Sequence, residues 1–251
     1  MNKHEEDMKF FLRLDDDMAK DVILDSLQVS DEDVVRICAL PQRSDEWHVA
    51  RENRITGSRA GGCIGASEYD TPDSVLKCML WGSDFKGNAA TRRGTAMEPF
   101  AQASLLRISK KQHSEHAELD TPGLIVCKED PIFAYSPDGI LTLEHGRKVL
   151  VEIKAPFNRK PYGVTPRQYF AQIQLGMWVT GLAECLFVEY CGEGDDDDTK
   201  THVKTIKRDD TYINKRLLPL ARAFYFQRFL PLKISQYRGQ LGMNRIFAAK
   251  A

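Results

Sequence analysis

The chain has 251 residues, of which 42% are hydrophobic and 28% are charged, and its formal net charge is −1. This composition excludes a disordered chain and is sufficient for one substantial core. The near-neutral total does not exclude a nucleic-acid partner. Residues 1–40 hold five Lys/Arg and eleven Asp/Glu, so the remainder holds thirty Lys/Arg and twenty-five Asp/Glu. We therefore expect an acidic helical extension over residues 1–40 and a single, mildly basic domain over residues 41–251.

The six cysteines, at positions 38, 63, 78, 127, 185 and 191, form no Cys-x-x-Cys pair. This spacing disfavours zinc and iron–sulfur sites. The acidic amino terminus lacks the long apolar stretch of a signal peptide or a membrane span. We therefore expect an intracellular protein with reduced thiols.

The predicted elements begin with short acidic helices within residues 1–40, which form either a cap or a partner surface. They continue with a helix over 43–54, a small-residue helix capped by Thr56 or Ser58, a helical stretch over 76–81, a mobile connection over 82–90, and a helix over 95–108 with Pro99 in its opening turns. Strands follow at 123–127, 133–136, 139–142 and 149–154, then a loop over 155–166, a helix over 167–180, a hairpin of 186–191 with 202–207, and a closing helix over 211–229. This order is typical of an α/β sandwich, a mixed sheet with helices on both faces.

The segment Ser136-Pro137-Asp138-Gly139 precedes the triplet Glu152-Ile153-Lys154. Alternation along a strand places Glu152 and Lys154 on one face, while Ile153 points to a core. If Asp138 belongs to the preceding strand of a hairpin, its carboxylate reaches Glu152 across the pair. Two acids then face one cation. The alternative is that Glu152 and Lys154 form an ordinary ion pair on a half-solvated sheet.

Mg²⁺ prefers oxygen ligands and keeps several waters, so the two carboxylates and the carbonyl of Ile153 would supply half of its coordination shell. Substrate phosphate would complete that shell. Lys154 would orient the attacking water or stabilise the developing charge. The triplet therefore predicts a Mg²⁺-dependent nuclease centre, with Mn²⁺ as the expected substitute.

Two further polar residues bear on this prediction. Gln172 stands among apolar neighbours on the predicted helix over 167–180, where an amide needs a partner. It either holds Lys154, water or phosphate, or is a core amide satisfied by the backbone. Glu98 either supports the metal site from the helix over 95–108, through a water or a second cation, or is a solvated acid near the start of that helix.

Basic residues indicate an anion site. Arg51 and Ser58 are seven residues apart, at the end of one predicted helix and the start of the next, where a guanidinium, a hydroxyl and free amides suit a terminal phosphate. Alternatively, Ser58 is only a cap. The glycines over 57–62 lack the Gly-Lys-Ser/Thr ending of a nucleotide loop, which excludes that kind of ATP site. Arg159 and Lys160 follow the 149–154 strand in a loop that either grips a DNA backbone or is simply solvated.

Five blocks of the sequence, taken together, resemble the lambda-exonuclease family, also described as YqaJ-like viral recombinases, within the PD-(D/E)xK nucleases. The blocks fall within residues 43 to about 208 and stand in the family's order. They are Arg51-Glu52-Asn53-Arg54-Ile55-Thr56-Gly57-Ser58, Gly94-Thr95-Ala96-Met97-Glu98-Pro99, Ser136-Pro137-Asp138-Gly139, Glu152-Ile153-Lys154-Ala155-Pro156-Phe157, and Ala171-Gln172-Ile173-Gln174 leading into Met177-Trp178-Val179-Thr180.

The resemblance implies a restriction-endonuclease-like core in which Asp138, Glu152 and the Ile153 carbonyl bind the metal. It also implies that Lys154 activates water or stabilises charge and that Glu98 and Gln172 support the centre. A second set of residues would hold the five-prime phosphate of a recessed strand, namely Arg51, Ser58, Ser136, and either Lys160 or Arg159.

The family digests one strand of duplex DNA from its five-prime end, releases mononucleotides and leaves a three-prime single strand for an annealing protein. The resemblance therefore implies a recombination or repair exonuclease, viral or phage-derived, that acts in the host cytoplasm or nucleus without a membrane. It further implies a ring-shaped homo-oligomer, often a trimer, around the duplex.

The sequence departs from the family pattern in three places. Gly57 replaces the alanine that usually precedes the serine, which loosens the helix start. Lys160 stands where the phage enzyme has an arginine, and the acidic loop over 195–198 is unexplained. Two alternative functions remain, a structure-specific endonuclease with the same centre and a non-catalytic DNA-binding or annealing module. The presence of Asp138, Glu152 and Lys154 argues against the second.

Overall fold

The computed structural model describes residues 3–83, 87–113, 115–156, 161, 167–194 and 197–241. Its α-helices are α1 (Lys3–Phe11), α2 (Asp16–Asp25), α3 (Asp31–Cys38), α4 (Asp45–Ala50), α5 (Gly57–Cys63), α6 (Pro72–Trp81), α7 (Ala89–Gln112), α8 (Arg167–Thr180), α9 (Asp210–Tyr212), α10 (Leu218–Phe224) and α11 (Leu230–Tyr237). Its strands are β1 (Ile55–Thr56), β2 (Glu118–Asp120), β3 (Ile125–Val126), β4 (Phe133–Tyr135), β5 (Gly139–Thr142), β6 (Lys148–Lys154), β7 (Glu184–Tyr190) and β8 (Thr201–Lys207). Short 3₁₀ turns at Glu144–Gly146 and Asp198–Lys200 precede β6 and β8.

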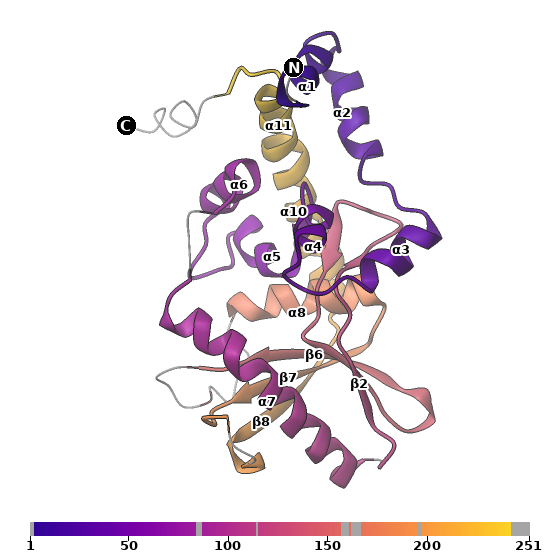
Figure 1. The fold of residues 1–251 in the computed structure, drawn as a ribbon, viewed down its shortest axis with the longest axis vertical. Coiled ribbons are helices and arrows are strands. Elements are labelled where there is room, and N and C mark those ends of the chain that lie inside the picture. The colour runs from indigo at the N-terminus through magenta and orange to yellow at the C-terminus, as the bar shows by residue number, and fades with distance from the viewer. Residues whose placement is uncertain are drawn as a thin grey trace.

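The main sheet has five strands in the order β2-β5-β6-β7-β8, with β6 and β7 parallel and the other neighbours antiparallel. Helix α8 connects the two parallel strands, as such a crossover requires. In Figure 1 the helices α1, α2, α6 and α11 lie at one end of the molecule, the sheet and α7 lie at the other, and α8 lies between them. The predicted mixed sheet flanked by helices is confirmed.

Helices cover both faces of this sheet. Successive residues of β6 point to opposite sides, so each face offers apolar side chains to one of these helices. Val151 and Ile153 pack with Ala101 and Leu105 of α7. The opposite face packs against α8, in a cluster of Tyr135, Leu150, Ile173, Met177, Cys185, Phe187 and Ile206. Glu152 and Lys154 therefore project toward α8, as the alternation predicted.

A second, smaller sheet, in the order β1-β4-β3, positions the segment that carries Asp138. Strand β1 is parallel to β4, with Ile55 beside Phe133 and Thr56 beside Ala134. Helix α5 begins immediately after β1, and β4 leads within three residues to Asp138. The two parts of the chain that carry the predicted phosphate and metal residues therefore start from paired strands.

Helix α7 is longer than predicted and begins before the expected helix over 95–108. Asn88 caps it by accepting a hydrogen bond from the amide of Thr91, so the helix starts within the connection predicted over 82–90. Of that connection, residues 84–86 lie outside the described residues. Our explanation of Pro99 is wrong, because this proline lies inside the helix and not in its first turn.

The closing helix continues past Phe229 to Tyr237 through two π-helical segments, Ile213–Leu217 and Tyr225–Phe229. Pro219 and Pro231 each stand one residue after the start of the α-helix that follows such a segment. Proline cannot donate the usual helical hydrogen bond and crowds the preceding turn. Wider turns before each proline are consistent with that constraint.

The acidic amino-terminal segment is helical, as expected, and joins the largest hydrophobic cluster. Phe11, Ala19 and Ile23 are buried in this cluster together with Leu230 and Ile234 of α11. All six cysteines are free thiols. Within the described ranges, no helix is both long enough and apolar enough to span a membrane.

Candidate active site

The hairpin of β5 and β6 brings Asp138 beside Glu152. Gly139 stands opposite Val151 in this antiparallel pair, so the residue before β5 lies next to Glu152. The amide of Ile153 donates a 2.6 Å hydrogen bond to Oδ2 of Asp138. The sheet register thus fixes the relative positions of the two carboxylates, with Asp138 immediately before β5.

The carboxylate of Glu152 is 1% exposed and accepts three side-chain hydrogen bonds. Lys154 Nζ and Gln172 Nε2 donate to Oε1 at 2.5 Å and 2.6 Å. The hydroxyl of Tyr135 donates to Oε2 at 2.5 Å. The Glu152–Lys154 pair is therefore part of a buried network and not an exposed surface ion pair.

The two glutamines of α8 have different environments. Gln172 contacts the acidic centre, whereas Gln174 is fully buried and bonds to backbone, donating to the Lys207 carbonyl at 3.0 Å and accepting from the Asp209 amide at 2.8 Å. The alternative considered for Gln172, a core amide satisfied by the backbone, thus describes Gln174.

Burial, followed by the charge of Glu152, raises the pKa of Asp138 to about 8. Burial alone would lower the pKa of Lys154, but Glu152 and Asp138 outweigh it and raise that pKa above its usual range. The ammonium also lies over the ring of Tyr169, at 4.9 Å from the centroid. Lys154 is therefore charged at neutral pH, whereas burial beside Glu152 disfavours the ionised form of Asp138.

Helix α7 contacts the Asp138 segment through a residue that the sequence did not single out. Gln102 donates a 2.8 Å hydrogen bond to the Asp138 carbonyl. Glu98, one turn earlier, contributes to raising the pKa of Asp138, but its own carboxylate pairs with Arg43 at 2.9 Å. A metal-supporting role for Glu98 remains a prediction.

Arg51 lies in a partly buried polar cluster at the end of α4. Its guanidinium donates to the hydroxyls of Ser136 and Thr56 at 3.1 Å and 3.2 Å and stacks over the Trp47 ring at 4.0 Å. Burial and then the charge of Arg59 lower the pKa of Arg51 to about 10. Arg51 is half-buried, and among the described residues no carboxylate pairs with it.

Arg51 and Ser58 line the same cavity, of about 970 Å³, together with Arg59 and Lys233. Ser58 is not the helix cap, because Thr56 occupies the cap position of α5. The Thr56 hydroxyl makes no capping bond and accepts a hydrogen bond from Arg51 instead. Ser136 is held from two sides, since the indole of Trp47 also donates to its hydroxyl at 3.0 Å. Arg159 and Lys160 lie outside the described residues.

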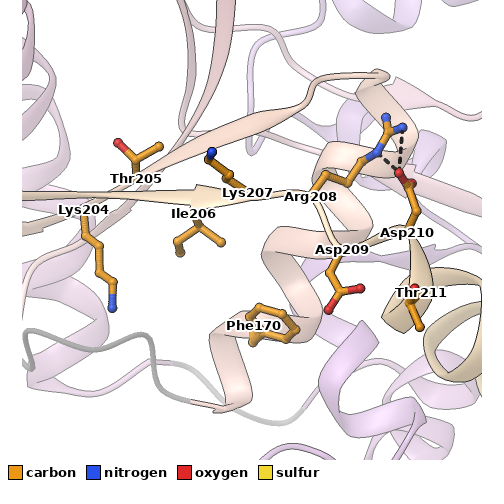
Figure 2. Close-up of a pocket in the computed structure, with 9 residues that line it drawn as sticks. All are labelled: Phe170, Lys204, Thr205, Ile206, Lys207, Arg208, Asp209, Asp210 and Thr211. Carbon is orange, nitrogen blue, oxygen red and sulfur yellow. Dashed lines mark hydrogen bonds and ion pairs between the residues drawn. The ribbon is translucent and has the colours of Figure 1, made fainter.

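A second cavity, of about 700 Å³, lies beside β8 and the start of α8. Figure 2 shows Lys204 and Ile206 on the same side of β8 as Phe170, whereas Thr205 and Lys207 point to the other side. Lys204 is in register with Phe187 of β7, and Phe187 with Glu152 of β6. Lys204 therefore lies on the same face of the sheet as the acidic centre, two strands away.

Comparisons with known proteins agree with this geometry. The sequence profile described as "YqaJ-like viral recombinase domain" matches residues 46–183, which is more than half of the chain. The chain is 28% identical to the alkaline exonuclease LHK-Exo from Laribacter hongkongensis, whose structures include a complex with dAMP. The two share a fold with a TM-score of 0.61, over 78% of this chain and 97% of that one.

Two viral proteins are also similar in sequence. Protein D345L of African swine fever virus is 27% identical over 203 residues, 64% of this chain and 55% of that protein. Uncharacterized protein R354 of Acanthamoeba polyphaga mimivirus is 28% identical over 174 residues, 62% of this chain and 30% of that protein. The chain thus spans about half or less of these viral relatives. The profile match and the shared fold confirm the family inferred from the five sequence blocks, and this chain belongs to the YqaJ-like viral recombinase domain family.

Proposed function

We propose that this protein is a Mg²⁺-dependent exonuclease that digests one strand of duplex DNA from a five-prime phosphorylated end. One observation carries the proposal, namely the short connection between the acidic centre and Arg51, a half-buried cation with which no carboxylate pairs among the residues that the structure describes. Ser136 binds Arg51, and Asp138, two residues later, faces Glu152. Two residues span at most about 7 Å. A terminal phosphate held at Arg51 would therefore lie about one nucleotide from the acids.

The donor set fits Mg²⁺. Among the described residues there is no group of three His, Cys, Asp or Glu side chains that could hold a metal ion. The sheet register places two carboxylates together, so Asp138, Glu152 and the Ile153 carbonyl would hold the ion and leave positions for water and phosphate, as Mg²⁺ prefers. The raised pKa of Asp138 supports this assignment, because a cation would offset the repulsion between the acids. When bound, the ion would polarise the phosphoryl oxygen and lower the pKa of a bound water.

The remaining residues act on charge and position. Lys154 donates to Glu152 beside the proposed metal site, so it would orient the attacking water or stabilise the negative charge that develops on the phosphoryl group. Gln172 would hold Glu152 through its hydrogen bond. Lys204 would contact the DNA backbone away from the cut, since it lies on the same face of the sheet.

The relatives of this chain support the proposal. LHK-Exo is described as an alkaline exonuclease and has been captured with dAMP, a mononucleotide. The proposal accordingly includes release of mononucleotides and a three-prime single strand for recombination or repair in a virus. A homo-oligomeric ring and an annealing partner belong to the same proposal, and a mass measurement in solution tests the first.

The test compares duplex ends with and without a five-prime phosphate. Arg51→Gln should slow digestion of phosphorylated ends by about 10-fold or more, because it removes a charged donor, while hydroxyl ends change little. Arg36→Gln is the matched control, since Arg36 is exposed on α3 and pairs only with Asp33 among the described residues. Equal losses on both kinds of end would refute the phosphate pocket.

A further inference from the structure

Tyr135 contacts the acidic centre but does not appear among the residues predicted from the sequence. It is the last residue of β4, is fully buried, and donates a 2.5 Å hydrogen bond to Oε2 of Glu152. Burial and then the charge of Glu152 raise its pKa well above the usual range. The phenol is the donor in this contact, because an ionised carboxylate oxygen can only accept.

Two glycines leave the space that the ring of Tyr135 occupies. A Cβ on Gly57 of α5 would lie 2.4 Å from a ring carbon, and a Cβ on Gly176 of α8 would lie 2.5 Å from another. Contacts this short cannot exist, so any side chain at either position must displace the ring. Gly57 thus has a packing role that the sequence did not reveal, beyond loosening the helix start.

The three donors to Glu152 are complementary. Lys154 and Gln172 bind Oε1, and Tyr135 alone among the described residues binds Oε2. A flexible amine and a long amide hold one oxygen, whereas a rigid ring between two backbones holds the other. Partners of this kind orient metal ligands, and their loss typically lowers metal affinity about 10- to 100-fold.

We propose that Tyr135 is a positioning residue that fixes the carboxylate plane of Glu152 for divalent-metal binding, and that Gly57 and Gly176 form the slot that fixes Tyr135. The proposal rests on the metal centre of the proposed function. It also joins the two halves of the site, because Gly57 lies between Thr56, which binds Arg51, and Ser58.

The experiment measures Mn²⁺ binding to the whole protein by electron paramagnetic resonance, without DNA, for wild type and Tyr135→Phe. The phenylalanine keeps the ring in its slot and removes only the hydroxyl. We expect the dissociation constant to rise at least about 10-fold. Tyr225→Phe is the matched control, because Tyr225 is also fully buried and donates to a backbone carbonyl, that of Asn53. It should bind Mn²⁺ like wild type.

Activity provides a second readout. Tyr135→Phe should lose turnover at low Mg²⁺ and regain most of it at high Mg²⁺, with little change in KM for DNA. Gly57→Ala, which must shift the ring, should weaken Mn²⁺ binding in the same direction. Wild-type Mn²⁺ affinity in either variant would overturn the inference. Absence of Mn²⁺ binding by wild type would instead overturn the metal centre of the proposed function.

Discussion

Replacing Asp138 with asparagine should stabilise the metal-free protein at neutral pH, although it should abolish the proposed activity. The pKa of Asp138 is raised to about 8 in the folded protein, against about 4 in an unfolded chain. Between these pH values the folded state binds a proton that the unfolded state has released. The free energy of unfolding must therefore fall as the pH rises from about 4 to about 8.

The size of the effect follows from the same pKa values. The free energy of unfolding falls by about 1.4 kcal/mol for each pH unit above the ordinary pKa of about 4, which amounts to about 4 kcal/mol at pH 7. This is an upper limit, because Asp138 retains some exposure to solvent. Half of it, about 2 kcal/mol, would raise Tm by about 4–8 °C in a chain of this size. Asparagine can still accept the hydrogen bond from the Ile153 amide.

Thermal unfolding of wild type and Asp138→Asn, in chelator and across pH 5 to 8, measures this prediction. The variant should gain most at pH 7 to 8 and least at pH 5, and Mg²⁺ should stabilise wild type alone. Asp210→Asn serves as control, since Asp210 is an exposed acid paired with Arg208 and should change stability by less than about 0.5 kcal/mol. A lower Tm for Asp138→Asn at pH 7 in chelator would refute the reasoning.

Three other predictions follow from the contacts of the site. Gln174→Leu should lower the free energy of unfolding by about 1–3 kcal/mol in urea, because it leaves the Lys207 carbonyl and the Asp209 amide unpaired, and metal binding should persist. Gln172→Leu should instead lower turnover about 10-fold or more in a cleavage assay, because Glu152 loses a donor. Trp47→Phe should raise KM for phosphorylated ends by up to about 10-fold, since Ser136 loses a donor; unchanged KM would count against the cluster. Asp198→Asn should tighten duplex binding, because Asp198 neutralises Arg107 and Lys111 of α7. The plot of log binding constant against log salt concentration should become steeper by about one or two released counterions, and an unchanged slope would dismiss this role.

The parts of the site that the sequence predicted are those set by strand alternation. Glu152 and Lys154 share a face because they are two residues apart on β6, and Asp138 reaches Glu152 because a hairpin has only one register that keeps Val151 in the core. Gln172 was also recognisable, since an amide among apolar helix residues must find a partner. These inferences depend on local geometry alone.

The missed contacts depend on how distant elements pack. Tyr135 reads as a core residue of a short strand, and the one available signal is that a buried tyrosine hydroxyl needs an acceptor. That Gln102 would reach the Asp138 carbonyl could not be predicted without the placement of α7. The pairing of Glu98 with Arg43 joins residues 55 positions apart. The closing helix was predicted to end at Phe229, but it continues to Tyr237 because Pro231 follows a π-helical segment, which relieves the clash with the preceding turn.

The most direct test of the proposed function is digestion of linear duplex DNA labelled at either end, with or without five-prime phosphates, beside a closed circle, in Mg²⁺ or chelator. We predict mononucleotides released only with Mg²⁺, from phosphorylated five-prime ends, with circles intact. Nicked or linearised circles would contradict the exonuclease and indicate an endonuclease, and binding without cleavage would indicate a non-catalytic DNA-binding module.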